Sequence, residues 1–283
     1  MHMADALLSP AVGGVMWATT AATIAFCAKK TQQDLDDRKV PLMGVLGAFI
    51  FAAQMINFTI PATGSSGHLG GGMILAILLG PYAAFLVIAS VLTVQALFFA
   101  DGGLLALGCN IFNLGFFPCF IAYPLIYKPI AGNRKTPKRL ALAATLAAIV
   151  SLQLGALGVV LETVASGISA LPFSEFLAAM LPIHFAIGLV EGMVTTAVIS
   201  FVWKARPEIL EYSAVARPLG NLSIARVLIG LGLAAIITGG ALSWFASSYP
   251  DGLEWSMAKT SGQEELAAPH RGIHHLLAEI QEK

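Results

Sequence analysis

Hydrophobic and polar positions along this chain form long alternating blocks, separated by short polar stretches. A helix that crosses a membrane needs roughly 20 consecutive apolar residues. The pattern predicts apolar helices at residues 10–28, 41–60, 70–80, 82–100, 104–127, 140–161, 176–203 and 227–247. The block at 70–80 is too short to cross unaided, so we expect it to face protein, as a discontinuous helix joined to the glycine-rich loop before it.

Composition strengthens the membrane interpretation. The chain is 57% hydrophobic and 11% charged, with a mean hydropathy of +0.79, whereas soluble domains carry about 25% charged residues. We therefore expect an all-α polytopic membrane protein with about eight transmembrane helices. The formal net charge of zero gives no indication of nucleic-acid binding, and Cys27, Cys109 and Cys119 lie in apolar runs typical of buried core positions.

Basic residues predict the orientation. The loops after the first, fifth and seventh blocks hold 13 of the 16 lysines and arginines, and the loops after the second, fourth and sixth hold none. Cytoplasmic loops are enriched in such residues, so both termini are expected outside, in the inner (plasma) membrane of a prokaryote. No Lys or Arg precedes Lys29, so the first block is expected to be a retained span and not a cleaved signal peptide.

Candidate metal chemistry begins at the N-terminus. The amine of Met1, the amide nitrogen of His2 and His2 Nδ1 can close two chelate rings on one metal ion, and His68 can supply a fourth nitrogen. Four nitrogens in a plane suit Ni(II), Cu(II) or low-spin Co(II). The charge pattern assigns Met1, His2 and His68 to the same outer face. The alternative is that His2 is a disordered terminal residue and His68 an ordinary loop histidine.

Four polar residues fall inside apolar blocks, where such residues are costly and usually face the bundle interior. His184 and Glu191 are seven apart and share one helix face. They could form a proton relay, a metal transit pair or a hydrogen-bonded pair that joins helices. Asn110 and Asn113 also share a face, and they could orient His2 or His68 or simply join helices.

No motif for nucleotide hydrolysis is present. The pattern GxxxxGK[ST] is absent because no lysine follows a glycine, and HExxH is also absent. We therefore expect that the chain itself is not an enzyme. If it concentrates a metal, the energy must come from partner subunits or from an ion gradient.

Several motifs together resemble the CbiM/NikM family, the substrate-capture components of energy-coupling factor transporters for cobalt and nickel. They are Met1-His2-Met3-Ala4-Asp5, Leu8-Ser9-Pro10, Ser66-Gly67-His68-Leu69, Gly80-Pro81, Gln95-Ala96-Leu97, Asp101-Gly102-Gly103, Asn110-Ile111-Phe112-Asn113 and His184 with Gly188, Glu191 and Gly192. The resemblance implies that the N-terminal amine, His2 and His68 hold Ni(II) or Co(II), which is the transported substrate and not a cofactor. It also implies a transmembrane coupling (T) subunit and two ATP-binding subunits as partners.

The C-terminal part carries a second resemblance. Pro250-Asp251-Gly252-Leu253-Glu254 is similar to the PDGLE segment of the small accessory membrane subunit of these transporters, so the chain looks like a fusion. We place a metal-capture domain at 1–215 and an additional helix with a polar outer tail at 216–283. No further span follows the motif, so a separate accessory subunit remains possible. His270, His274 and His275 could scavenge metal or belong to a solvated helix at 264–282.

Two alternatives remain open from the sequence. An ion-gradient-coupled transporter of a polar organic solute would use His184 and Glu191 as its proton relay. A membrane scaffold without a ligand would retain no metal. The nitrogen ligands do not discriminate nickel from cobalt, because both metals accept them.

Overall fold

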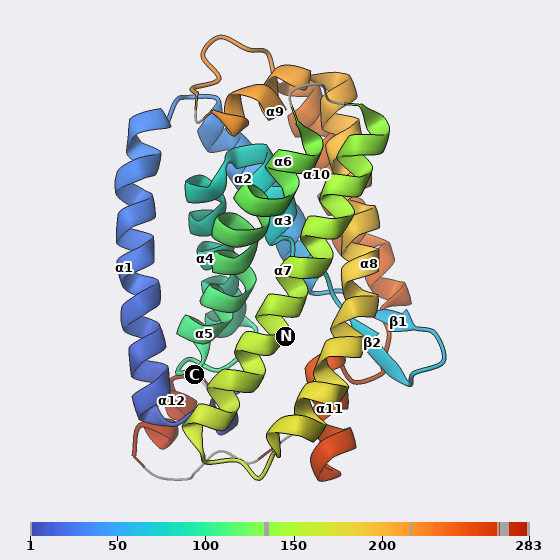
Figure 1. Cartoon of the computed structure of the whole chain (residues 1–283). Coiled ribbons are helices and arrows are strands. Elements are labelled where there is room, and N and C mark those ends of the chain that lie inside the picture. Colours follow the sequence, from blue (N-terminus) through green and yellow to red (C-terminus); the bar gives the residue numbers. More distant parts are fainter. Residues whose placement is uncertain (1, 133–135, 216, 265, 267–271, 282–283) are drawn as a thin grey trace.

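The chain forms an elongated helical bundle with one small β-hairpin at its side (Figure 1). The computed structural model describes residues 2–132, 136–215, 217–264, 266 and 272–281. The helices are α1 (Pro10–Asp34), α2 (Lys39–Gln54), α3 (Gly72–Leu79), α4 (Pro81–Phe98), α5 (Leu107–Ile111), η2 (Phe112–Tyr127), α6 (Lys128–Ala131), α7 (Pro137–Ser166), α8 (Phe173–Ala205), α9 (Pro207–Ala214), α10 (Ala225–Gly240), α11 (Gly252–Ser261) and α12 (Ile273–Gln281). Short 3₁₀ turns lie at η1 (Asp5–Leu7) and η3 (Leu242–Phe245).

Among the described residues, five helical segments are long and apolar enough to cross a membrane: Pro10–Gln33, Pro81–Phe98, Leu107–Ala131, Pro137–Ser166 and Phe173–Ala205. The third of these is one continuous rod made of α5, η2 and α6, wound as a π-helix over Phe112–Tyr127. Helices α2 and α10 are apolar but only 16 residues long. The chain is thus a helical membrane protein, and the count of eight crossings stays a prediction.

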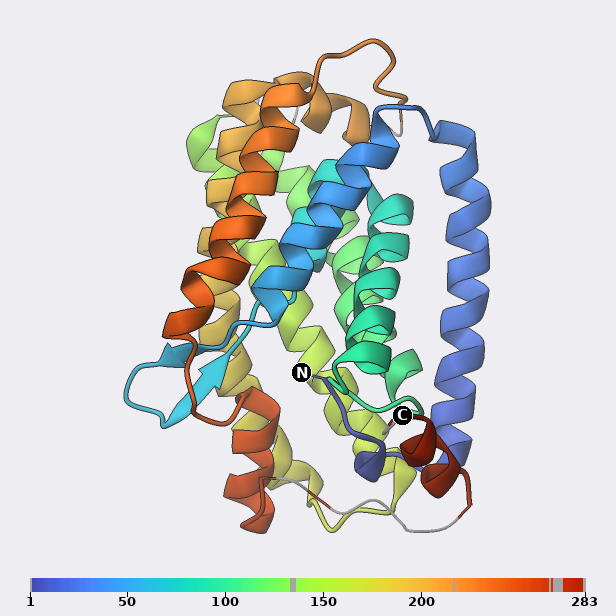
Figure 2. The same ribbon diagram turned by 180° about the vertical axis from the view of Figure 1, so that it is seen from behind.

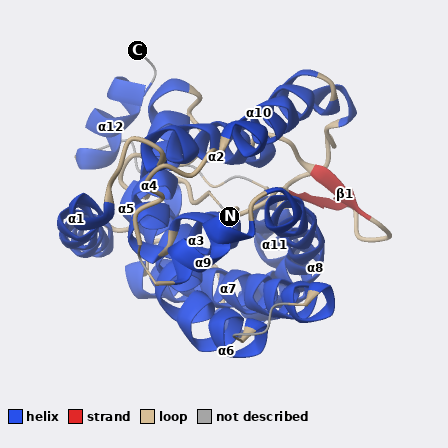
Figure 3. Cartoon of the chain, turned by 90° about the horizontal axis from the view of Figure 1, so that it is seen from above, coloured by secondary structure: helices blue, strands red, loops and turns tan. Residues whose placement is uncertain are grey.

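Helix α3 lies at the centre of the bundle. Seen from above, it is surrounded by α2, α4, α7 and α8 (Figure 3), and each of its eight residues is buried. The expectation that this short apolar helix faces protein is confirmed. Gly71 at its N-terminus has φ +76°, and a Cβ atom there would approach Ile50 to 2.6 Å. Glycine is therefore needed both for the left-handed backbone and for the close packing against α2.

Several predicted boundaries are wrong, since α1 continues past residue 28 to Asp34 and α10 ends at Gly240; two further cases are informative. The block at 41–60 is not one helix, because α2 ends at Gln54 and Phe58–Ile60 forms strand β1. The limits at 161 and 176 are also wrong, because α7 continues to Ser166 and α8 begins at Phe173. In the second case the polar residue Glu162 is buried inside α7 and bonded to a neighbouring helix, so polarity alone does not mark the helix end.

The two ends of the bundle differ. The connection between α1 and α2 and the helix α9 lie at one end (Figure 1), and the basic residues Arg38, Lys39, Arg206 and Arg217 lie in or beside these segments. The turn η1 and helices α11 and α12 lie at the opposite end, and the view from behind shows the same arrangement (Figure 2). Which of the two ends faces outward stays a prediction from the charge pattern.

Candidate metal centre

A β-hairpin delivers His68 to the bundle. Strand β1 (Phe58–Ile60) pairs antiparallel with β2 (Ser65–Gly67), with Thr59 opposite Ser66. His68 follows β2 directly, and 8% of its side chain is exposed. Its Nδ1 lies 3.1 Å from the carbonyl oxygen of Leu69. Because a carbonyl only accepts, this contact places a proton on Nδ1.

The N-terminal segment reaches the same place through backbone hydrogen bonds. The Met3 N–H donates to Asn110 Oδ1 at 2.8 Å, and Asn110 Nδ2 donates to the Met3 carbonyl at 3.2 Å. Gly103 N–H also donates to the Met3 carbonyl, at 2.9 Å, and Asp5 accepts from the Ala106 N–H at 2.9 Å. Asn110 therefore fixes the backbone of the residue that follows His2, as an outer partner of the predicted site would.

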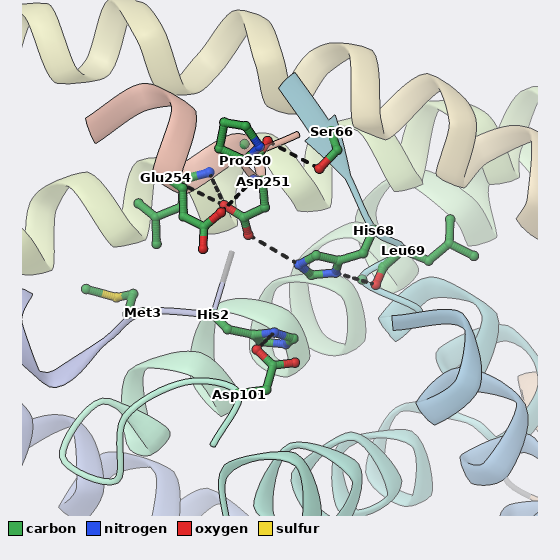
Figure 4. A network of polar contacts seen from close by, with 12 residues as sticks. His2, Met3, Ser66, His68, Leu69, Asp101, Pro250, Asp251 and Glu254 are labelled. Carbon is green, nitrogen blue, oxygen red and sulfur yellow. Dashed lines mark hydrogen bonds and ion pairs between the residues drawn. The ribbon is translucent and has the colours of Figure 1, made fainter. Parts of the chain in front are cut away.

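His2 and His68 meet although they belong to separate segments. Their rings stack with centroids 4.7 Å apart and an angle of 15° between the planes, as Figure 4 shows. His2 is largely buried, and its Nε2 has no hydrogen-bond partner among the described residues. The sequence prediction that these two histidines share one end of the bundle therefore agrees with the structure. Met1, the third predicted ligand residue, lies outside the described residues.

Asp101 is the immediate partner of His2. His2 Nδ1 lies 2.8 Å from Asp101 Oδ1. Burial lowers the pKa of His2 below its ordinary value, although the hydrogen bond with Asp101 opposes this shift. Burial alone would raise the pKa of Asp101, but the hydrogen bond from His2 and its charge leave it lowered. At neutral pH the pair is thus a neutral imidazole beside an ionised carboxylate. The ring nitrogen predicted to chelate is the one that Asp101 holds.

Side chains alone do not make a complete metal cage. Among the described residues, no group of three or more His, Cys, Asp or Glu is arranged to hold a metal ion. A site at His2 and His68 therefore requires backbone nitrogens as well, as the predicted chelate does. A cavity of about 370 Å³ adjoins this region and is bordered by His2, Asp101, Asp251 and residues of α12. It leaves open space beside His2.

The C-terminal segment also reaches His68. Asp251 Oδ2 lies 3.7 Å from His68 Nε2, and the two residues face each other in Figure 4. Sequence reasoning named neither Asp101 nor Asp251 as a site residue. Both occur in motifs that carried the family resemblance, Asp101-Gly102-Gly103 and the PDGLE segment. Their predicted location on the same face as His68 was the one indication that could have identified them.

His184 lies beneath His68, inside the bundle. Its side chain is fully buried, Nδ1 lies 2.8 Å from the Met180 carbonyl, and Nε2 has no partner among the described residues. His184 and His68 border one small cavity of about 10 Å³, which is close to the space of one water molecule. The structure thus brings His184 next to the histidine pair.

Glu191 binds the backbone that follows His68. Its Oε2 accepts from the Gly70 N–H at 2.5 Å, and its Oε1 accepts from the Gly71 N–H at 2.9 Å. Gln54 Nε2 donates to the Gly70 carbonyl at 2.7 Å, so this peptide is held from both sides. Among the hydrogen bonds that the structure describes, none joins Glu191 to His184. Glu191 therefore anchors the loop between His68 and α3.

Asn113 lies away from the histidines. Its Nδ2 donates to Glu162 Oε2 at 2.7 Å, and both residues are buried. This bond joins η2 to α7, which corresponds to the helix-joining alternative for Asn113. Asn110 and Asn113 are only three residues apart, yet one contacts the N-terminal segment and the other a neighbouring helix.

The tail histidines have separate environments. His274 is 6% exposed, and its Nε2 lies 2.9 Å from the Leu8 carbonyl. His275 Nδ1 lies 3.6 Å from Glu279, and both side chains are more than half exposed. His270 lies outside the described residues. The prediction of a fully solvated terminal helix is thus wrong for His274, because α12 packs this side chain against the N-terminal segment.

Comparisons with known proteins identify the family of the chain. Residues 2–209 match the CbiM family, described as "Cobalt uptake substrate-specific transmembrane region", and residues 225–283 match the PDGLE domain. A putative metal transport protein of Haloquadratum walsbyi is 36% identical over 74% of this chain and 93% of its own length. The fused nickel transport protein NikMN of Rhodobacter capsulatus is 30% identical over 96% of this chain and 83% of its own length.

Solved structures show the same fold. A crystal structure titled as a truncated transition metal transporter is 30% identical, with a TM-score of 0.64, and the match covers 72% of this chain and 99% of that one. A second, titled as a transition metal transporter, is 28% identical with a TM-score of 0.65, over 76% and 99% of the two chains. On these matches the chain belongs to the CbiM family of cobalt and nickel transport proteins and carries a PDGLE domain at its C-terminal end.

Proposed function

We propose that this chain is the substrate-specific component of an ATP-driven energy-coupling factor importer, and that it captures Ni(II) or Co(II) at the outer membrane face. The observation that carries the proposal is the buried, stacked pair of His2 and His68, contributed by two segments far apart in the sequence. The metal ligands are the Met1 amine, the His2 amide nitrogen, His2 Nδ1 and His68 Nε2. The ion is cargo that leaves the site during each transport cycle.

Capture exchanges one partner of His2 for another. His2 Nδ1, which contacts Asp101 at 2.8 Å, would turn to the metal after its proton has moved to His2 Nε2, which has no hydrogen-bond partner among the described residues. The amide proton of His2 would be released to solvent. Four nitrogens then lie near one plane, an arrangement that suits Ni(II) and low-spin Co(II). The contact of His68 Nδ1 with the Leu69 carbonyl supports this step, because it orients the ring so that the metal is bound through Nε2.

Hydrogen bonds to the backbone next to His2 and next to His68 hold the two histidines in place. Asn110 holds the backbone beside His2, and Glu191 holds the backbone beside His68. His184, with its unpartnered Nε2 bordering the small cavity below His68, is the next nitrogen that an ion would meet on an inward path. The bundle itself does not hydrolyse ATP in this proposal. A transmembrane coupling subunit and two ATP-binding subunits move it within the plasma membrane.

The experiment compares metal accumulation in prokaryotic cells that express the chain with its coupling and ATP-binding subunits. We expect nickel or cobalt uptake in the parent, loss of uptake in His2→Ala, and persistence of uptake when a protonophore is added while cellular ATP is maintained. Uptake that collapses with the protonophore and is indifferent to His2→Ala would contradict the proposal. That result would favour the proton-coupled solute transporter.

A further inference from the structure

An apolar groove runs along the outside of the bundle, between helix α1 and the pair α2 and α4. Its volume is about 670 Å³, and most of the side chains that line it are apolar. Helix α1 stands at the edge of the bundle (Figure 3). Because α1 and α4 are long and apolar enough to cross a membrane, the groove faces the hydrocarbon of the bilayer, where no water is available to fill it.

The length of the groove corresponds to one leaflet. Along α2 it extends from Val40 to Phe51, and this separation along a helix is about 16 Å at 1.5 Å per residue. The hydrocarbon core of a bilayer is about 30 Å thick, so each leaflet contributes about 15 Å. The acyl chain of a lipid in one leaflet can therefore occupy the groove over its whole length.

The groove has a polar end with an unbonded hydroxyl. Thr31 borders the groove, is 5% exposed, and its Oγ1 has no hydrogen-bond partner among the described residues. The other three threonines of α1, Thr19, Thr20 and Thr23, each donate to a backbone carbonyl. A buried hydroxyl without a partner costs free energy, so Thr31 is the position on this helix at which a bound molecule would supply a missing acceptor.

The depth of Thr31 indicates which part of a lipid it would meet. Along α1 (Pro10–Asp34), the distance from Pro10 to Thr31 is about 32 Å, close to the thickness of about 30 Å of the hydrocarbon core. With α1 across the bilayer, Thr31 lies where the hydrocarbon meets the headgroups. The ester and phosphate oxygens of glycerophospholipids occupy that level, and they are hydrogen-bond acceptors.

Charge at this end is compatible with a phosphate group. Residues 29–39 contain four basic and three acidic residues, an excess of one positive charge. Lys29 and Arg38 are exposed, whereas both carboxylate oxygens of Asp36 accept from backbone N–H groups, including that of Gly220. Basic side chains beside a membrane surface attract anionic lipid groups.

The middle of the groove is unfilled by the protein. Gly44 of α2 borders it, and a Cβ atom at this position would meet nothing within 4 Å. Apolar atoms that line an empty space lose dispersion contacts on that side. An acyl chain along α2 restores those contacts.

We propose that this groove binds one glycerophospholipid of the surrounding bilayer. An acyl chain lies along α2 between Val40 and Phe51, and an ester or phosphate oxygen accepts a hydrogen bond from Thr31. The lipid thereby packs between α1, the helix that follows the N-terminal segment, and the rest of the bundle. The inference does not depend on the metal site, so the two proposals stand or fall separately.

The test uses two substitutions, each with a matched control on α1. Gly44→Leu fills the groove, and leucine is a better helix former than glycine, so α2 should persist. Its control is Gly14→Leu, since Gly14 is exposed and a Cβ there also meets nothing within 4 Å. Thr31→Val removes the unbonded hydroxyl and keeps the shape of the side chain. Its control is Thr19→Val, at an exposed threonine that donates to the Val15 carbonyl.

The full chain is reconstituted in vesicles of phosphatidylethanolamine and phosphatidylglycerol and extracted in a mild detergent, and native mass spectrometry counts the phospholipid retained per chain. We expect one in the parent and in both controls. Gly44→Leu should lower retention about tenfold or more, because leucine takes the space of the acyl chain. Thr31→Val should lower it about 2–10-fold, the value of one hydrogen bond.

A parent that retains no phospholipid would overturn the inference, as would equal retention by Gly44→Leu and Gly14→Leu. A parent without lipid, combined with a Gly44→Leu variant that no longer assembles with the coupling subunit, would also overturn it and would assign the groove to a helix of that subunit.

Discussion

Two sets of buried polar side chains in this molecule behave differently. Within the bundle, Glu191 and Asn113 bond to backbone or to a side chain of another helix. At the end that carries the hairpin, His2, His68 and Asp251 face one another. Bonds of the first kind satisfy polar groups and hold helices together. Side chains of the second kind come from separate segments and meet at the place where the metal site is proposed.

The difference shows that burial of a polar residue does not by itself indicate a binding site. His184 lies between the two sets, because Nδ1 contacts the Met180 carbonyl while Nε2 faces the small cavity beneath His68. The discriminating feature is whether a buried polar group bonds within the helical bundle or meets ionisable groups from other segments. Substitutions in the two sets should therefore affect different measured quantities.

The largest effect is expected at His68. His68→Ala removes a nitrogen ligand, so the Kd for Ni(II) should rise by more than the about 10–100-fold typical of outer partners. Titration of the purified protein with Ni(II) measures this change. His275→Ala is the control, since this exposed histidine contacts only Glu279 among the described partners. Similar Kd values for both variants would place the metal elsewhere.

Glu191→Gln should lower the stability of the metal-free protein, because Glu191 anchors backbone and is not a metal ligand in this proposal. The amide has one acceptor where the carboxylate has two, so either Gly70 or Gly71 loses its bond inside the bundle. A buried unsatisfied donor costs about 1–3 kcal/mol, which a lowered unfolding midpoint of the metal-free protein would report. Glu175→Gln, an exposed change on the same helix, should leave the midpoint almost unchanged. An equal loss in both would show that Glu191 is no anchor.

Asn110 and Asn113 allow the two sets of polar side chains to be compared within one helical segment, because they lie only three residues apart. Asn110→Ala and Asn113→Ala each remove buried hydrogen bonds and should each cost about 1–3 kcal/mol of stability. Only Asn110→Ala should also weaken metal binding, by about tenfold, because Asn110 holds the segment behind His2. Weakening by Asn113→Ala of the same size would remove the distinction between the two sets.

The smallest effect is expected in the tail. His274→Gln keeps an N–H donor for the Leu8 carbonyl, so stability should change by about 0.5 kcal/mol or less, as for most mild substitutions. The number of metal ions bound per chain, measured by elemental analysis, should also remain that of the parent. A decrease in that number would identify the tail as a metal-scavenging segment.

Much of the fold follows from local sequence properties. The apolar blocks located α1, α4, α7 and α8 because burial and helix formation in a membrane depend on runs of neighbouring residues. The distribution of basic residues predicts that His2 and His68 lie on the same face of the membrane. The family motifs drew attention to the PDGLE segment, but they gave it no position relative to His68.

The remaining features depend on contacts between distant segments. Asp251 meets His68 because Ser66 bonds to Tyr249 and Pro250, and nothing near Asp251 in the sequence indicates this pairing. Glu191 was considered with His184 because the two share a helix face, whereas its partners are backbone groups of another segment. Backbone donors have no residue-specific pattern, so a sequence cannot reveal them as partners.

The central claim is that the N-terminal amine, the His2 amide and the side chains of His2 and His68 bind one metal ion. The most direct test measures the metal content of the purified chain and of a variant with one alanine inserted between Met1 and His2. The insertion retains every side chain but breaks the pair of chelate rings. The account predicts one nickel or cobalt ion per chain in the parent and loss of that ion in the variant. Equal metal content in both proteins would contradict it.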